Sequence, residues 1–213
     1  MILYLIRHGI TDAHLENRRQ SPTTPLGEFG RKQAESLAAK MHLTKLDHLY
    51  SSEWPRAIQT AQFIANKSAL KIKTHPLVHE IIKPPQLNDI PLDGELCQRA
   101  VRESQENMDN FDWKFEGQGE SINDVIMRAK TVLDFLKNQH KNETVAIISH
   151  GLFIIIMTTL ILLGDDYGNK MFRKVSRSLK VNNTGVGSFS FDPETNHWTM
   201  LCFNDHGHLE NEN

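Results

Sequence analysis

The chain has 213 residues, of which 39% are hydrophobic and 23% are charged, and its formal net charge is −2. This composition is typical of a folded globular protein, and the length suits one domain with a sizeable core. Nucleic-acid binders usually carry a basic excess gathered on one face, so we expect no nucleic-acid partner. The charge balance is compatible with a small anionic ligand held by a few local arginines.

Targeting signals and cysteines point to an intracellular protein. The N-terminus opens directly on the apolar run Ile2 to Ile6, without the basic lead-in and small-residue cleavage site of a secretory signal. The apolar run from Leu152 to Leu163 is shorter than the roughly 20 residues that span a bilayer, so we interpret it as a buried helix and expect no membrane association. Cys97 and Cys202 are too few for a disulfide framework. We therefore expect a cytoplasmic location with both thiols reduced.

Short apolar runs alternate with helical patterns in the first part of the chain. Residues 2–7 form a run that ends in Arg7, which predicts a strand buried on both faces. An apolar stripe predicts an amphipathic helix over 27–41; its members are Leu26, Phe29, Ala34, Leu37 and Met41. Further expected elements are a strand at 48–50, a helix from Pro55 to about Asn66 with Ser52 as its N-cap, and a strand at 71–74.

Residues 81–119 are rich in Pro and Gly and irregular, apart from an expected helix near 95–108. Ser121 and Asp124 then form a capping-box pattern at the start of a clearly amphipathic helix. An apolar strand at 145–149 leads through His150-Gly151 into the helix from Leu152. Alternating residues predict the final strands, at 179–182, 187–191 and 197–203.

This order of elements predicts an α/β fold, a three-layer α/β/α sandwich around one mixed, mostly parallel sheet. We expect residues 1–213 to form one domain, with 81–119 as a cap inserted over the site. Ligands bind at the carboxyl ends of strands in such sheets. Arg7-His8, the segment Ser51 to Arg56 and His150-Gly151 each follow a predicted strand, so these segments should meet at one edge.

The residues at that edge suit attack on phosphorus. His8 is a competent nucleophile when one ring nitrogen is unprotonated, and the charge of Arg7 favours the neutral imidazole. Gly9 allows backbone to approach a bound group closely. Arg56 can grip two phosphate oxygens with its planar fork, and His150 precedes a helix N-terminus, which favours an anion. Together these side chains form a cage for the charge of a transferring phosphoryl group.

Phosphoryl transfer to His8 also requires a proton for the departing oxygen. A carboxylic acid can supply that proton and then act as a base toward water. Glu80, just after the third predicted strand, is the candidate. No Gly-x-Ser-x-Gly elbow accompanies Ser51 and Ser52, so helix capping is the expected role of these serines rather than nucleophilic attack.

Five sequence blocks, taken in chain order, resemble those of the histidine phosphatase (phosphoglycerate mutase-like) superfamily. The resemblance covers nearly the whole chain except 81–118. The blocks are Leu-Ile-Arg-His-Gly-Ile-Thr at 5–11, Pro-Leu-Gly-Glu-Phe-Gly-Arg-Lys-Gln-Ala at 25–34, Ser-Ser-Glu-Trp-Pro-Arg-Ala-Ile-Gln-Thr-Ala at 51–61, Gly-Glu-Ser at 119–121 and Ile-Ser-His-Gly at 148–151. Asn-Thr-Gly at 183–185 also resembles the C-terminal end of that family.

The resemblance implies a phosphorylated nucleophile at His8, a phosphate pocket completed by Arg7, Arg56, His150 and Gly151, and Glu80 as acid and base. The chain departs from the family pattern after the RHG triplet, where it has Ile10, and six residues beyond the nucleophile, where it has His14 with Asn17 nearby. We expect these three residues at the substrate rim, where they affect substrate identity more than the chemistry.

The expected activity is that of a metal-independent, histidine acid phosphatase-type phosphomonoester hydrolase acting on a small phosphorylated metabolite through phosphohistidine. Phosphoglycerate mutase-type transfer is one alternative, since the same residues serve both reactions. A catalytically silent phosphate-binding protein is the other, and the intact set of His8, Arg7, Arg56 and His150 argues against it. We expect no cofactor and no metal, because the eleven histidines are scattered and His206-Gly207-His208 lies in a polar tail. The apolar C-terminal strands are compatible with a homodimer.

Overall fold

The computed structural model describes residues 1–164 and 168–209, which form a six-stranded sheet in the order β3-β2-β4-β1-β5-β6. Strands β1 to β4 run parallel to one another, and β5 and β6 are antiparallel additions at one side. The prediction of a mixed, mostly parallel sheet is confirmed. The strands are β1 (Ile2–Arg7), β2 (His48–Ser51), β3 (Ile72–Thr74), β4 (Thr144–Ser149), β5 (Val186–Asp192) and β6 (His197–Asp205).

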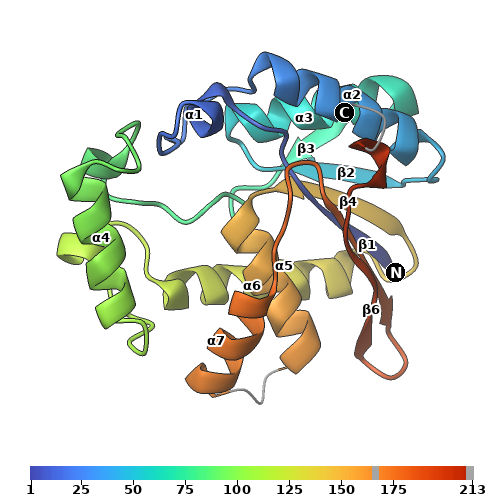
Figure 1. Ribbon diagram of the computed structural model, residues 1–213. Coiled ribbons are helices and arrows are strands. Elements are labelled where there is room, and N and C mark those ends of the chain that lie inside the picture. Colours follow the sequence, from blue (N-terminus) through green and yellow to red (C-terminus); the bar gives the residue numbers. More distant parts are fainter. Residues whose placement is uncertain (165–167, 210–213) are drawn as a thin grey trace.

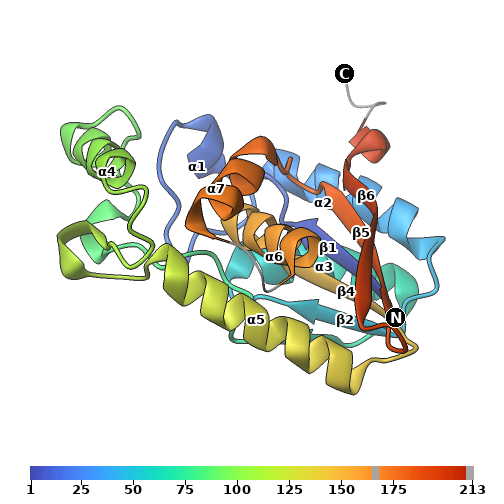
Figure 2. The ribbon, with the colours of Figure 1, turned by 90° about the horizontal axis from the view of Figure 1, so that it is seen from below.

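Helices cover both faces of this sheet, as the two views of the ribbon show (Figures 1 and 2). Residues of α2 and α3 pack with one face of β1 and β4, and residues of α5 and α6 pack with the other. The three-layer α/β/α sandwich is therefore confirmed. The helices are α1 (Asp12–Leu15), α2 (Glu28–His42), α3 (Pro55–Ser68), α4 (Glu95–Glu106), α5 (Ile122–Gln139), α6 (Gly151–Leu163) and α7 (Asn169–Ser178).

The central strand β1 divides the hydrophobic core in two. Leu3 and Leu5 point into the cluster formed with α5 and α6, whereas Ile6 belongs to the cluster formed with α2 and α3. All three side chains are fully buried. A strand whose two faces both pack on helices reads as a continuous apolar run, which is why the sequence identified it.

The helix ends and stripes follow mostly from local sequence. In α5 the predicted capping box is confirmed: Asp124 N donates to Ser121 Oγ at 3.1 Å, and Ser121 N donates to Asp124 Oδ2 at 2.9 Å. In α2 the expected stripe is buried except for Phe29, which is 42% exposed. Gly30 occupies the buried position of that turn instead, directly under the backbone of Ile10.

Two local predictions are wrong. Residues 179–182 are not a strand, because their backbone groups are engaged by side chains: Arg7 Nη1 donates to Val181 O at 2.8 Å, and Asn182 N donates to Asn204 Oδ1 at 2.7 Å. Ser52 is not the N-cap of α3, since the cap residue is Trp54 and Pro55 occupies the first helical turn. Helix α7, which has Phe172 as its one buried residue, was not predicted.

The segment 81–119 lies to one side of the sandwich, with α4 standing apart from the sheet (Figures 1 and 2). It has a small apolar cluster of its own, made by Leu87, Ala100 and Phe115. Backbone bonds tie it to the loop after α1: Leu92 N donates to Asn17 O at 2.8 Å, and Arg19 N donates to Ile90 O at 2.9 Å. The predicted helix near 95–108 is confirmed as α4.

Across residues 1–164 and 168–209, no helix combines the length and the apolar character that a bilayer span requires.

A close crossing of two backbones fixes the loop after the first strand. A Cβ atom at Gly30 would lie 1.9 Å from Ile10 O, and one at Gly9 would lie 2.6 Å from Gly30 O. Gly9 is thus needed for contact with α2 rather than for contact with a bound group. We predict that Gly30→Ala lowers the free energy of unfolding by about 1–3 kcal/mol, because backbone atoms must shift to admit the methyl group.

Urea unfolding measures this loss. Gly168→Ala is the matched control, since a Cβ atom there meets nothing within 4 Å. Equal stability of the two variants would contradict the importance of the crossing.

Candidate active site

Three segments meet at the carboxyl edge of the sheet, as the sequence predicted. His8 follows β1, Arg56 lies in the first turn of α3 beyond β2, and His150 follows β4. The ring centroids of His8 and His150 are 5.0 Å apart. Beside them is a cavity of about 390 Å³ that Arg7, Arg56 and Glu80 help to line.

Hydrogen bonds fix the ring of His8 in one orientation. Its Nδ1 lies 2.7 Å from Gly9 O. Because a carbonyl oxygen can only accept, Nδ1 carries the hydrogen and the neutral ring keeps its lone pair on Nε2. Arg56 Nε donates to that Nε2 at 3.2 Å. The backbone is held equally firmly, since His8 N donates to Ser149 O at 3.0 Å and Asn183 Nδ2 donates to His8 O at 2.9 Å.

The surroundings of His8 keep its ring neutral. Burial lowers the pKa of His8 well below its ordinary value, and the proximity of His150 and of the charged Arg56 and Arg7 lowers it further. The bond to Gly9 acts in the opposite direction but does not compensate. An imidazole that stays unprotonated with a fixed tautomer is the form that can attack phosphorus.

Two guanidinium groups flank this ring, that of Arg56 buried and that of Arg7 partly buried. Arg56 is 1% exposed and donates from Nη1 to Ser21 O at 2.8 Å, and its Cζ lies 4.6 Å from the centroid of the Trp54 ring. Burial lowers the pKa of Arg56 to about 10, which still leaves it charged at neutral pH. Burial also lowers the pKa of Arg7, whereas Glu80 raises it. Both groups therefore present positive charge next to His8.

His150 completes the cage from the N-terminus of α6. Its Nε2 lies 2.9 Å from Ser52 Oγ, and burial followed by the charge of Arg56 lowers its pKa well below the ordinary value. Its Nδ1 and the Nε of Arg7 are buried, and neither has a hydrogen-bond partner in the protein. Such groups cost about 1–3 kcal/mol each and call for a specific explanation. An anion at the helix N-terminus can engage both.

Glu80 faces the same cavity from the loop that follows β3. Its Oε2 accepts a hydrogen bond from Leu152 N, in the first turn of α6, at 3.1 Å, and its Oε1 accepts one from Ile81 N at 3.0 Å. The carboxylate is thus held at the mouth of the cage on the helix that carries His150. Gly151, between His150 and Leu152, packs against the side chain of Arg7.

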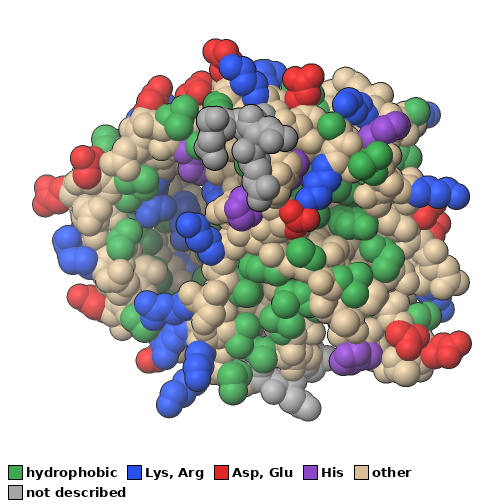
Figure 3. Space-filling model, turned by 45° about the vertical axis from the view of Figure 1, so that its right-hand side comes forward, with side chains coloured by type: hydrophobic (Ala, Val, Ile, Leu, Met, Phe, Trp, Pro, Cys, Tyr) green, Lys and Arg blue, Asp and Glu red, His purple; other side chains and the backbone are tan. Residues whose placement is uncertain are grey.

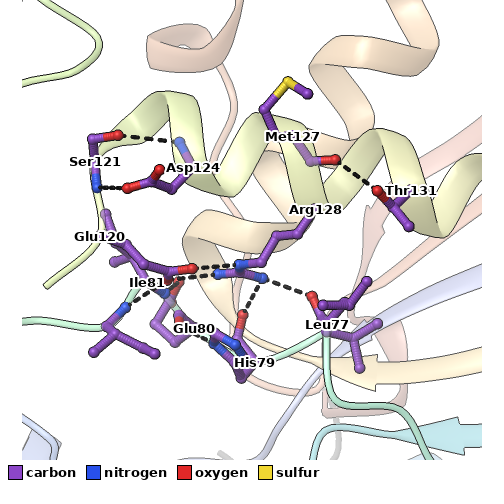
Figure 4. A network of polar contacts seen from close by, with 12 residues as sticks. Leu77, His79, Glu80, Ile81, Glu120, Ser121, Asp124, Met127, Arg128 and Thr131 are labelled. Atoms are coloured by element: carbon purple, nitrogen blue, oxygen red, sulfur yellow. Dashed lines mark hydrogen bonds and ion pairs between the residues drawn. The ribbon is translucent and has the colours of Figure 1, made fainter.

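A buried ion pair holds the Glu80 segment in place (Figure 4). Arg128 of α5 donates from Nη1 to Leu77 O at 2.7 Å and to His79 O at 2.9 Å, on the N-terminal side of Glu80. The same guanidinium binds both carboxylate oxygens of Glu120, with Nε to Oε1 at 2.9 Å. Glu120 in turn accepts from Ile82 N at 2.8 Å. The segment is therefore pinned on both sides of Glu80.

Of the three residues predicted at the rim, His14 lines the cavity, and Ile10 and Asn17 are not among its lining residues. His14 is half-buried, with its Nε2 3.1 Å from Arg7 Nη2, and burial and the nearby arginines lower its pKa to about 4. Ile10 N is instead bonded to Gln33 Oε1, and Asn17 O accepts from Leu92 N.

Sequence reasoning missed two contributors to the cage, Ser52 and Trp54. Ser52 was expected to cap a helix, but its hydroxyl contacts His150. Trp54 stacks on His79 with ring centroids 5.7 Å apart and meets His150 edge-on at 4.9 Å. Both belong to the block that contains Arg56, so their position after a strand was the available signal. Their contacts with His150 join segments that are distant in sequence, so the sequence pattern did not reveal these contacts.

The cavity is strongly electropositive. Among the described residues, five that line it are Arg or Lys, namely Arg7, Arg18, Arg19, Arg56 and Lys83, and one, Glu80, carries a carboxylate. Figure 3 shows Lys and Arg side chains inside a hollow of the surface. The pKa of Lys83 is lowered by burial and by Arg19. A cage with this excess of positive charge suits a doubly negative phosphate.

A group of potential metal ligands lies elsewhere. In the described parts of the chain, one cluster of three such residues has its ligand atoms within 4.8 Å of one another: His48, His140 and Glu143. It lies at the amino ends of β2 and β4, opposite the cage. Glu143 Oε2 is 2.6 Å from His140 Nδ1 and 3.2 Å from His48 Nε2, as expected for a hydrogen-bonded network.

Known proteins resemble this chain over nearly its whole length. It is 30% identical to phosphoglycerate mutase-like protein 4 of Arabidopsis thaliana, over 98% of this chain and 86% of that protein. It is 31% identical to phosphoserine phosphatase 1 of Hydrogenobacter thermophilus, over 70% of each. The structure of phosphoserine phosphatase from Entamoeba histolytica in complex with 3-phosphoglyceric acid superimposes with a TM-score of 0.77 at 27% identity, over 98% of both chains.

The sequence also matches a family model. That model describes the histidine phosphatase superfamily (branch 1), and the match extends over residues 3–206. It therefore includes every segment that contributes to the cage, from Arg7 to Asn183. The chain belongs to the histidine phosphatase superfamily, branch 1.

Proposed function

We propose that this protein hydrolyses phosphomonoesters through a phosphohistidine at His8, without a metal ion. The orientation of His8 is the observation that carries the proposal. Its Nδ1 is bonded to Gly9 O, so Nε2 keeps a lone pair beside the guanidinium of Arg56. A nucleophile fixed in this way among cations can attack a phosphoryl group whose charge those cations neutralise.

In the first step the phosphoryl oxygens bind Arg7, Arg56 and His150. Arg56 Nε, which donates to His8 Nε2 in the free protein, turns its N–H to a phosphoryl oxygen. The freed lone pair of His8 Nε2 then forms a bond to phosphorus while the ester P–O bond breaks. Protonated Glu80 donates its proton to the departing alkoxide, so the alcohol leaves neutral. The contact of Glu80 with the N-terminus of α6, at 3.1 Å from Leu152 N, places the acid beside the cage and supports this role.

In the second step water attacks the phosphorus of phosphohistidine. Glu80, now a carboxylate, accepts a proton from that water, the N–P bond breaks, and inorganic phosphate leaves with His8 restored. The two steps account for every atom and proton without a redox partner or an added cofactor. The cations lower the barrier of both steps because they stabilise charge spread over the transferring group.

We also propose that residues 81–119 act as a cap that selects the substrate. Leu87, Asn88 and Leu92 of this segment line the active-site cavity, which supports the assignment. A small phosphorylated metabolite is the substrate class favoured by the similarity to phosphoserine phosphatases. The acid phosphatase type of activity, a cytoplasmic location and a homodimer stay predictions from the sequence.

Phosphoglycerate mutase-type transfer is the second candidate, because a relative at 30% identity bears the name phosphoglycerate mutase-like. The residues of the cage serve both reactions, and the difference is whether water or a second substrate hydroxyl receives the phosphoryl group. Product analysis with a phosphoglycerate separates them. The complete set of Arg7, His8, Arg56 and His150 argues against the third reading, a silent phosphate binder.

We predict that His8→Ala lowers kcat for an aryl phosphate by about 10³-fold or more, because the covalent route is lost. Wild-type activity should persist in EDTA, and wild-type protein quenched in alkali should carry an acid-labile phosphoryl group that the variant lacks. Steady-state assays and mass spectrometry measure both effects. His42→Ala, exposed on α2, is the control and should retain full activity. Equal activity of His8→Ala and wild type would refute the proposal.

We predict that Glu80→Gln lowers kcat with phenyl phosphate by about 10²–10⁴-fold, because the poor leaving group requires a proton. With 2,4-dinitrophenyl phosphate the first step needs no proton, so phosphohistidine should still form in a single-turnover burst. Rapid-quench measurements with both substrates give the comparison, with exposed Glu53→Gln as the control. An equal loss of the burst for both leaving groups would rule out Glu80 as the acid.

We predict that His8 stays neutral in the folded protein at pH values well below 6.5, the ordinary value for histidine. Nitrogen chemical shifts of the ring, followed by NMR from pH 8 downward, measure this. Since the unfolded chain then binds more protons than the folded one, the free energy of unfolding should fall as the pH drops below 6.5. A His8 titration midpoint near 6.5 would contradict the argument.

A further inference from the structure

A second cavity lies next to the active site, between the segment after α4 and the helices α6 and α7. Its volume is about 310 Å³, and its walls are mainly apolar and aromatic, with contributions from Phe111, Trp113, Leu152, Ile155 and Phe172. No Asp or Glu is among its lining residues in the described chain. We call this cavity the α6–α7 groove.

The groove borders the active site. Leu152 lines both cavities, and its backbone N–H donates to Glu80, the proposed acid. A third cavity, of about 300 Å³ under the cap, joins them from the other side. That cavity shares Lys83 with the active site and Trp113 with the groove. The cage and the groove are therefore neighbours with Leu152 at their shared wall, which is the placement expected of a subsite for the group attached to a phosphate.

The lining suits an apolar group. Leu152, Ile155 and Ile156 lie three and four residues apart on α6, so they form one apolar face toward the groove. Phe111 meets Phe172 edge to face with ring centroids 5.6 Å apart, which joins the segment after α4 to α7. Arg173 of α7 forms an ion pair with Asp109 at the edge. The groove is thus an apolar slot with two arginines among its lining residues, Arg173 and Arg177, and Arg177 Nη1 lies 3.7 Å from Met108 Sδ.

We propose that the α6–α7 groove is the leaving-group subsite, and that it takes phosphomonoesters whose alcohol carries an extended apolar chain or ring. This inference rests on the proposed function, because it assumes that the phosphate occupies the cage. A volume of about 310 Å³ lies at the low end of the roughly 300–1,000 Å³ typical of ligand pockets, so it fits a tail rather than a second polar head. A three-carbon acid would leave the groove empty.

Binding of n-alkylphosphonates from butyl to octyl tests the subsite without hydrolysis, because the C–P bond is not a substrate for the proposed reaction. Each fully buried methylene group tightens binding by about 4-fold. For a partly open groove we expect Kd, measured by calorimetry, to fall by about tenfold or more between butyl and octyl. Inorganic phosphate should displace every member of the series. A Kd that is independent of chain length would overturn the proposal.

Two serines of α7 give a matched pair of variants. Ser176 lines the groove and Ser178 does not, and both hydroxyls donate to backbone carbonyls of the same helix. Ser176→Trp should abolish the dependence on chain length while leaving butylphosphonate binding within about 2-fold of wild type, and Ser178→Trp should retain it. Retention of the dependence in Ser176→Trp would place the tail elsewhere and overturn the proposal.

A second pair avoids steric effects on folding. Met108 lines the groove and is 36% exposed, whereas Met171 is 53% exposed and is not a lining residue. Met108→Glu should weaken octylphosphonate binding about tenfold or more without affecting butylphosphonate, because the tail then meets a charge, and Met171→Glu should change neither. Equal effects of the two substitutions would contradict the subsite.

Hydrolysis of butyl and octyl phosphate separates the two proposals. Their leaving groups have similar basicity, so a higher kcat/KM for octyl phosphate reports on the groove and supports it. Turnover of butyl phosphate without any chain-length effect in turnover or binding would leave the proposed phosphatase intact and remove the subsite. Chain-length-dependent phosphonate binding with no turnover of either ester would support the subsite and count against the phosphatase.

Discussion

The parallel pairing of β1 with β4 is the constraint on which the site depends. The register places Arg7 opposite Ser149, so the residues that follow each strand, His8 and His150, emerge side by side. His8 N continues the ladder by donating to Ser149 O. If β1 slipped by one residue against β4, His8 and His150 would lie on opposite faces of the sheet, because side chains alternate along a strand. The buried apolar faces of β1 and β4 hold this register.

The cage concentrates positive charge where water is scarce. Arg56 is almost fully buried, and burial lowers the pKa values of Arg7, Arg56, His8 and His150 alike. Carbonyls of Ser21 and Val181 and the carboxylate of Glu80 offset part of the desolvation of the two arginines. The two histidines avoid the desolvation cost of a buried charge by remaining neutral. A bound phosphate is the partner that this arrangement favours, since it supplies the negative charge the protein itself withholds.

The two walls of the site are built differently. On one side, Arg128 and Glu120 tie the Glu80 segment to α5 through a buried ion pair that also engages three backbone groups. Breaking such a pair is costly, so this wall is rigid. On the other side, the segment after α4 meets α7 through aromatic contacts and a solvent-exposed ion pair. Exposed pairs contribute little to stability, so this wall is held mainly by its aromatic contacts.

The local sequence determined the elements of the fold and most of the cage. Apolar runs marked β1 and β4, the Ser121–Asp124 pattern marked the start of α5, and the rule that ligands bind at the carboxyl edge of parallel strands brought His8, Arg56 and His150 together. Each of these signals acts over a few neighbouring residues or follows from strand order, so they can be read along the chain.

Only the tertiary structure decided how these parts touch. In the folded protein Ser52 contacts His150, Arg128 binds the Glu80 segment, and Gly9 lies against the backbone of α2. Residues 179–182, which were expected to form a strand, form a loop whose backbone is hydrogen-bonded to the side chains of Arg7 and Asn204. These contacts join residues distant in sequence, so no periodicity or spacing encodes them. The sequence specified which groups reach the edge of the sheet, and packing specified their partners, charge states and the groove beside them.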